Sequence, residues 1–127
     1  MRKRTLGLIF LAALAVGTAA CYRPYGHHLY PATPRFAPTY PGDVRLLRGD
    51  PRREHIRLGE VWVRPSPMDD RMYVEGVLKE KGAAMGADAV VIVADRYFRD
   101  RVYAGYWSPR RRVYDRQIVG IAIRYRR

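Results

Sequence analysis

The stretch G-A-D-A-V-V-I-V-A, residues 86–94, decides the fold of this chain. From Ala89 to Ala94 it is uninterruptedly apolar and rich in β-branched side chains, which is typical of a central strand covered on both faces. Gly86 stands in front of the run, and glycine is the residue that most readily ends a helix in the left-handed conformation. The stretch therefore predicts a helix end, a tight turn and a core strand.

An amphipathic helix is predicted directly before this stretch, over residues 67–85. Ser66 is the expected N-cap, since its hydroxyl can accept from the free amides of the first turn. Gly76 and Gly82 each cost a helix roughly 1 kcal/mol relative to alanine, so we expect them to mark close packing on a sheet. The apolar residues at helical spacing are Val74, Val77, Leu78, Ala84 and Met85.

Four further strands are predicted from short apolar runs bounded by turn residues. They span residues 44–47, 56–63 (with a bulge at Gly59), 101–107 and 113–125, the last two forming a hairpin around Ser108 and Pro109. The expected order is β-β-α-β-β-β. This order gives an α+β domain over residues 43–127, with a single mixed β-sheet and one packed helix.

Residues 1–20 have the pattern of a lipoprotein signal peptide. A basic start, Arg2 to Arg4, precedes an apolar run over residues 6–16, which is shorter than the about 18 residues that span a bilayer. Small residues then precede Cys21, as in the bacterial lipobox, although Thr18 stands where Leu or Val is most common. We expect Cys21 to be lipidated, and Tyr22 after it favours an outer membrane location facing the periplasm.

Residues 21–42 are predicted to form a proline-rich tether. They hold five of the nine prolines of the chain, and proline favours an extended, partly polyproline II backbone that would reach up to roughly 60 Å. His27 and His28 lie in this segment, and without a third ligand type nearby we expect them to be solvent-exposed. No metal site, cofactor or disulfide is predicted, because Cys21 is the only cysteine.

The charge balance points to anionic partners. The chain has 24 Lys and Arg against 12 Asp and Glu, an excess that attracts phosphates and carboxylates. No nucleic acid partner is expected, because a secreted lipoprotein rarely meets one. An anionic lipid or glycan, or an acidic part of an envelope membrane protein, is the expected partner beside the membrane itself, and a homo-oligomer stays open.

An enzyme is not expected. Once the signal peptide is removed, the only serines are Ser66 and Ser108, placed in a cap and a turn, and no catalytic triad or phosphate-binding loop is present. Asp69 and Asp70 are expected to favour the helix dipole. Asp88 lies in the helix-to-strand turn, where capping of the backbone is the expected role.

Four short motifs occur in a familiar order: D-V-R-L-L (43–47), L-G-E-V (58–61), A-A-M-G-A-D-A-V-V (83–91) and Q-I-V-G-I-A-I (117–123). Over residues 43–126 this order resembles the domain of the Rcs envelope-stress sensor lipoproteins, and it is similar to the YbjQ family. The resemblance implies a small α/β domain on an envelope lipoprotein. The YbjQ likeness would also imply self-association into rings or heavy-metal binding. The disulfides of the sensor domain have no counterpart here, and residues 107–114 are outside the shared pattern.

The segment most suited to binding is the predicted hairpin tip. Three arginines on one loop repel each other, and a multidentate phosphate or carboxylate would offset their charge. The candidate partner-binding residues are Tyr106, Trp107, Arg110, Arg111, Arg112 and Tyr114. They predict a membrane-anchored, non-enzymatic binding or sensor module. A structural or self-associating lipoprotein with an ordinary solvated hairpin, or a metal-binding domain of the YbjQ type, stays open as the alternative.

The first prediction concerns the anchor. Cys21→Ala removes the thiol that would carry the lipid, so this variant should be unprocessed or soluble and should incorporate no labelled palmitate. The wild-type chain, expressed in a Gram-negative host, should fractionate with membranes and incorporate the label. An unacylated wild-type chain would contradict the prediction.

Overall fold

The computed structural model describes residues 24–103 and 111–127, which form one five-stranded sheet and one α-helix. The strands lie in the order β1-β3-β5-β4-β2, with β2 parallel to β4 and the other neighbours antiparallel. The elements are β1 (Tyr25–Leu29), the 3-10 helix η1 (Pro41–Asp43), β2 (Arg45–Leu47), β3 (His55–Val63), α2 (Arg71–Ala84), β4 (Ala89–Tyr103) and β5 (Arg111–Tyr125). The predicted α+β fold with a single mixed sheet is confirmed.

The order of the elements differs from the expected β-β-α-β-β-β in two places. A strand, β1, precedes those that were predicted, and the strands expected over 87–94 and 101–107 are one continuous strand, β4. β4 continues because β5 pairs with it from Ala89 to Tyr103, through two register shifts after Ile92 and Arg99. The order of the described elements is therefore β-β-β-α-β-β.

The segment expected to be a tether belongs to the sheet from Tyr25 onward. β1 pairs along β3 from Tyr25 opposite Val63 to Leu29 opposite Gly59, and a side chain at Gly59 would collide with the backbone of His28. The following residues stay on the domain: Thr39 donates its amide to the Ala83 carbonyl at 2.9 Å. From Tyr25 onward this segment is therefore a paired strand, a turn with a φ of 60° at Ala32 and a stretch held on the domain.

Helix α2 begins later than predicted. The Asp70 carboxylate accepts from the Tyr73 amide at 2.7 Å and caps the helix, so the first helical residue is Arg71. Ser66 instead closes a turn, with its amide donating to the Asp69 carboxylate at 2.7 Å. The expected end is confirmed, because Gly86 follows the helix with a φ of 78°, a value that glycine adopts without strain.

Val90 is the centre of the core between α2 and the sheet. A Cβ atom at Gly82 of α2 would lie 2.5 Å from one methyl group of Val90, and a Cβ at Gly120 of β5 would lie 2.5 Å from the other. Gly82 therefore marks close helix–sheet packing, as predicted. Gly76 does not mark such packing, because it is exposed and a Cβ atom built there would have no neighbour within 4 Å. The other residues of this core are Val44, Leu58, Val61, Val63, Val74, Val77, Leu78, Ala83, Met85, Ala87, Ile118 and Ala122.

The opposite face of the sheet has a smaller cluster. Ala89, Val91 and Ile123 are buried there against partly buried neighbours, and the Arg53 guanidinium stacks 4.7 Å from the centre of the Tyr125 ring. Val93 is 53% exposed and lies at the register shift after Ile92. The expectation of a strand covered on both faces therefore holds for the first residues of β4 and fails at Val93.

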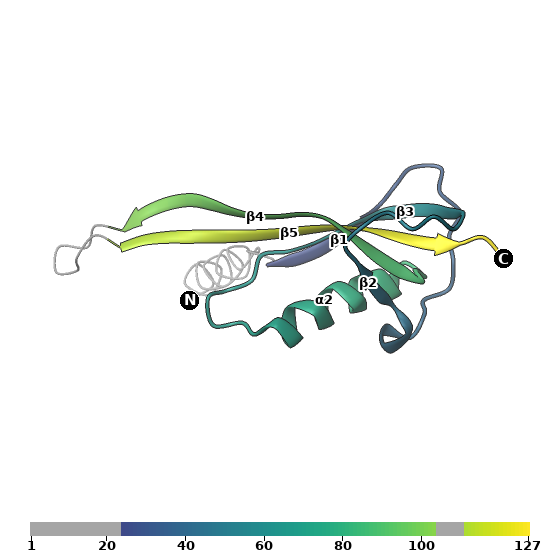
Figure 1. The fold of residues 1–127 in the computed structure, drawn as a ribbon, viewed down its shortest axis with the longest axis horizontal. Coiled ribbons are helices and arrows are strands. Elements are labelled where there is room, and N and C mark those ends of the chain that lie inside the picture. Colours follow the sequence, from purple (N-terminus) through teal and green to yellow (C-terminus); the bar gives the residue numbers. More distant parts are fainter. Residues whose placement is uncertain (1–23, 104–110) are drawn as a thin grey trace, which may run out of the picture.

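The outer parts of β4 and β5 form an arm. The last sheet partner of β4 on its other side is β2, up to Val91, and that of β5 is β3, down to Ile118. Beyond these points, residues 96–103 and 111–117 pair only with each other, and Figure 1 shows them projecting well past α2. Eight residues in β geometry extend roughly 26 Å. We call residues 96–103 and 111–117 the arm.

The second prediction tests the core. Leu78 is 1% exposed, so Leu78→Ala should lower the free energy of unfolding by about 2–5 kcal/mol, the usual effect of truncating a buried leucine. Met72→Ala on the same helix is the control, because Met72 is 82% exposed, and it should change stability by less than about 0.5 kcal/mol. Urea denaturation followed by circular dichroism measures both. A small effect of Leu78→Ala would show that α2 presents another face to the sheet.

Candidate functional site

The predicted binding residues fall partly outside the described residues. Cys21, Tyr106, Trp107 and Arg110 lie there. The other three are in β5, where Arg111 is opposite Tyr103, Arg112 is opposite Val102 and Tyr114 is opposite Arg99. The expectation that Arg111 and Arg112 belong to one loop with Arg110 is wrong, because strand pairing already begins at Arg111.

The base of the arm is held by an ion pair between its two strands. Arg116 donates to both carboxylate oxygens of Asp95, at 2.8 and 2.6 Å, and its guanidinium lies 5.5 Å from the centre of the Tyr97 ring. The hydrogen bond from Arg116 lowers the pKa of Asp95, and the same bond raises the pKa of Arg116. This contact ties β4 to β5 just where they leave the body of the domain.

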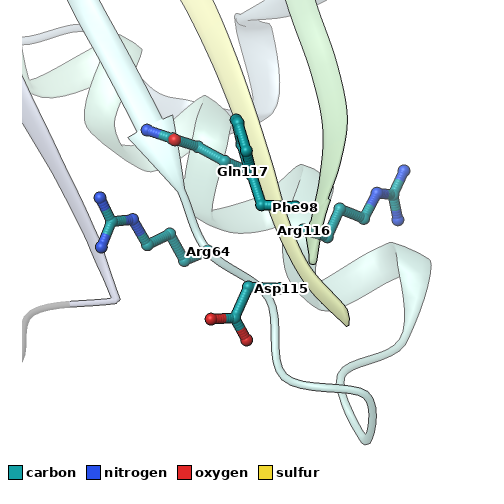
Figure 2. A pocket seen from close by; sticks show the side chains of 5 residues that line it. All are labelled: Arg64, Phe98, Asp115, Arg116 and Gln117. Atoms are coloured by element: carbon teal, nitrogen blue, oxygen red, sulfur yellow. The ribbon is translucent and has the colours of Figure 1, made fainter. Parts of the chain in front are cut away.

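A surface pocket of about 250 Å³ lies beside this base, where β3 ends and β5 continues without it. Figure 2 shows the five side chains that line it, with the side chains of Arg64 and Arg116 pointing away from each other on the two sides of Phe98. Asp115 and Gln117 are the other two. Within the described residues, Arg64 has no ion-pair partner and its side chain is exposed. The pocket thus offers an arginine and an aromatic ring at the root of the arm.

Exposed apolar side chains gather at this same end of the molecule. They come from the β3–α2 connection, the first turn of α2 and the arm, which lie toward the same end of the molecule in Figure 1. Five large apolar side chains are exposed there: Met68 (91%), Met72 (82%), Tyr73 (49%), Tyr97 (67%) and Phe98 (45%). Met68, Met72 and Tyr73 were not among the residues expected to bind a partner, although all three lie outside the buried stripe that begins at Val74.

The chain enters the sheet at the arm end as well. The Arg64 amide donates to the Pro24 carbonyl at 2.6 Å, and the next residue, Tyr25, is opposite Val63 at the end of β3. In Figure 1, β1 begins on the side from which the arm projects, and the C-terminus lies at the opposite end. Residues that precede Pro24 are therefore attached beside the base of the arm.

The other polar candidates have structural contacts. Asp88 accepts from the Tyr125 amide at 3.0 Å, so its carboxylate binds backbone as expected, but the backbone of β5 and not that of the helix-to-strand turn. His27 and His28 are exposed in β1, and the described part of the chain contains no group of three or more side chains that could hold a metal ion. None of the described helices is long and apolar enough to cross a membrane.

Comparisons with known proteins identify no relative. No family model, no curated protein and no solved structure matches the chain. The resemblance to the Rcs sensor lipoproteins and the YbjQ family therefore stays a prediction, and the argument for function depends on the arm and its surroundings.

The third prediction concerns the ion pair between Asp95 and Arg116 at the base of the arm. Because the pKa of Asp95 is lowered in the folded chain, its carboxylate stabilises the fold above the ordinary aspartate pKa, and this contribution disappears as the pH falls through the lowered value. Asp95→Asn should therefore reduce the free energy of unfolding at pH 7 by about 0.5–1 kcal/mol, as expected for a half-exposed pair. Wild type and variant should converge in acid. Urea denaturation at neutral and acidic pH measures this, and a constant difference would contradict it.

Proposed function

We propose that this chain is a lipid-anchored, non-enzymatic binding module of the bacterial cell envelope and that its arm contacts an anionic partner. The observation that carries the proposal is the arm itself, a two-stranded ribbon that projects from the domain with an unusual composition. Its 15 residues include six arginines, two aspartates and four aromatic residues.

The stability of such a ribbon is the first reason to expect a function for it. Two strands with no third strand or helix against them are marginally stable in water, so an arm of this length is expected to have a use beyond packing. Arg116 is paired with Asp95, and the two aspartates of the arm cannot neutralise the five other guanidiniums, which repel each other. Phosphates or carboxylates would supply the missing charge, and the planar guanidinium can bind either with two hydrogen bonds.

Aromatic residues between the arginines add a second kind of contact. Tyr97 and Phe98 are exposed on the arm, and the ring of Tyr97 is already stacked under Arg116. Rings of this kind can pack on the apolar part of a ligand while neighbouring arginines bind its charge. The arm is therefore suited to a partner with both anionic and apolar groups, as envelope lipids and the acidic segments of membrane proteins have.

The fourth prediction tests the arm as the anion-binding element. Arg111 and Arg112 of the arm, changed to Gln together with the preceding Arg110, should weaken binding of inositol hexakisphosphate, a soluble multidentate phosphate, by about tenfold or more at low salt. The full chain in nonionic detergent is titrated by calorimetry. The affinity of the wild type should also fall as salt is added, because the contacts are exposed.

A matched variant controls for total charge. Arg52, Arg126 and Arg127 are exposed at the end of the domain opposite the arm, and changing these three to Gln removes the same charge. This variant should bind the phosphate within about twofold of the wild type. Equal losses of affinity in both triple variants would show that binding depends on net charge alone. Equal affinity in all three proteins would show that the arm is not the binding site.

A further inference from the structure

We propose that the partner of the arm is the anionic phospholipid leaflet that holds Cys21, and that the domain faces this leaflet with its arm end. This inference rests on the proposed function and on lipidation at Cys21. The docking surface consists of exposed residues of this end: Arg64, Arg96 and Phe98 on the face of the sheet away from α2, and Met68 and Met72 on the β3–α2 connection and the start of α2.

The length of chain between the anchor and the fold supports this orientation. Pro24 is only three residues after Cys21, and three residues span at most about 11 Å even when fully extended. The polar headgroup layer on each side of a bilayer is itself roughly 5–8 Å thick. A lipidated Cys21 would therefore keep Pro24, and with it the end of β3, within a few ångströms of the headgroups. The tether of roughly 60 Å that the prolines suggested is not available, since β1 begins at Tyr25.

The exposed apolar side chains fit an interfacial location. Met68 and Met72 are more than four-fifths exposed, and Phe98 is 45% exposed, so all three would lose water contact against acyl chains and headgroups. Aromatic and long apolar side chains beside arginines are typical of segments that lie in the membrane interface. Each arginine near an anionic leaflet adds about 1 kcal/mol of attraction.

Several acidic residues at this end are already engaged within the domain. Asp70 caps α2 and Asp69 accepts the Ser66 amide. Glu75 binds Arg71 at 2.7 Å, and Asp95 binds Arg116. Asp115 lines the pocket at the arm base, and together with Asp100 it leaves two acids in the arm against five arginines besides Arg116.

Charge alone does not select this end, since Arg52, Arg126 and Arg127 make the opposite end basic as well. The arm end is favoured because the chain enters the sheet there and because most of the exposed apolar side chains lie there. Of the seven large apolar side chains exposed in the described residues, five lie at the arm end, and Tyr40 lies near the far end of α2.

The experiment places a probe at each end of the anchored protein. Met68→Cys and Tyr40→Cys introduce a thiol at two exposed positions, Met68 (91%) and Tyr40 (72%), while Cys21 is occupied by lipid. Each full-length lipidated variant is labelled with an environment-sensitive fluorophore and reconstituted in phosphatidylcholine vesicles with or without phosphatidylglycerol. Quenching by a spin-labelled lipid then reports the distance of each probe from the bilayer.

In vesicles that contain phosphatidylglycerol, the probe at residue 68 should be quenched about two- to threefold more strongly than the probe at residue 40. The difference should shrink in pure phosphatidylcholine, where the acyl anchor remains but the charge attraction is lost. Replacing Arg64 and Arg96 with Gln should have the same effect in the anionic vesicles.

Two results would overturn the inference. Equal quenching of the two probes would show that the domain has no fixed orientation, and stronger quenching at residue 40 would show that the opposite end faces the bilayer. Either result leaves the proposed function standing if inositol hexakisphosphate binding is still lost in the triple variant of Arg110, Arg111 and Arg112. Loss of the preference at residue 68 together with unchanged phosphate binding in that variant would refute both.

Discussion

The packing of Val90 between Gly82 and Gly120 is the constraint on which the rest of the structure depends. One methyl group of Val90 occupies the space that a side chain at Gly82 would need, and the other occupies the space at Gly120. α2 therefore approaches the sheet closely at one position, while β5 is held against β4 in one register. The register changes by one residue after Ile92 and again after Arg99, so beyond the core the two strands of the arm set their own pairing, with Arg116 bound to Asp95 at the base.

The antiparallel pairing of β1 gives the molecule two unlike ends. Because Tyr25 lies opposite Val63, the residues that precede the sheet attach where β3 stops and the arm begins. The C-terminus and the β2–β3 connection lie at the other end. An anchor at Cys21 would thus act on the arm end directly, and the exposed Met68 and Met72 would be placed where a membrane surface could cover them.

The sequence predicted the parts of the fold that depend on local chemistry. The helix end at Gly86, the irregular pairing near Gly59 and the burial of Leu78 were all foreseen, because glycine conformation and apolar periodicity are read over a few residues. β1 was missed because Y-G-H-H-L has no alternation, and its strand form depends on the free edge of β3. The continuity of β4 was missed because R-Y-F-R-D-R has no core face. At the candidate site, composition indicated the arginines, but only strand pairing shows that Arg111 and Arg112 lie in β5.

The free edges of the arm also bear on what can bind it. β4 has register shifts after Ile92 and Arg99, and such bulges disturb the regular pairing that a further strand needs. β5 is regular, but a second copy paired antiparallel about Tyr114 would place Arg112 opposite Arg116, and like charges directly opposite each other destabilise a sheet. Arginines along the arm therefore disfavour this self-pairing while they favour anionic groups. A phospholipid leaflet presents many anionic groups and no peptide backbone. It can therefore bind the arginine side chains without pairing with a strand edge.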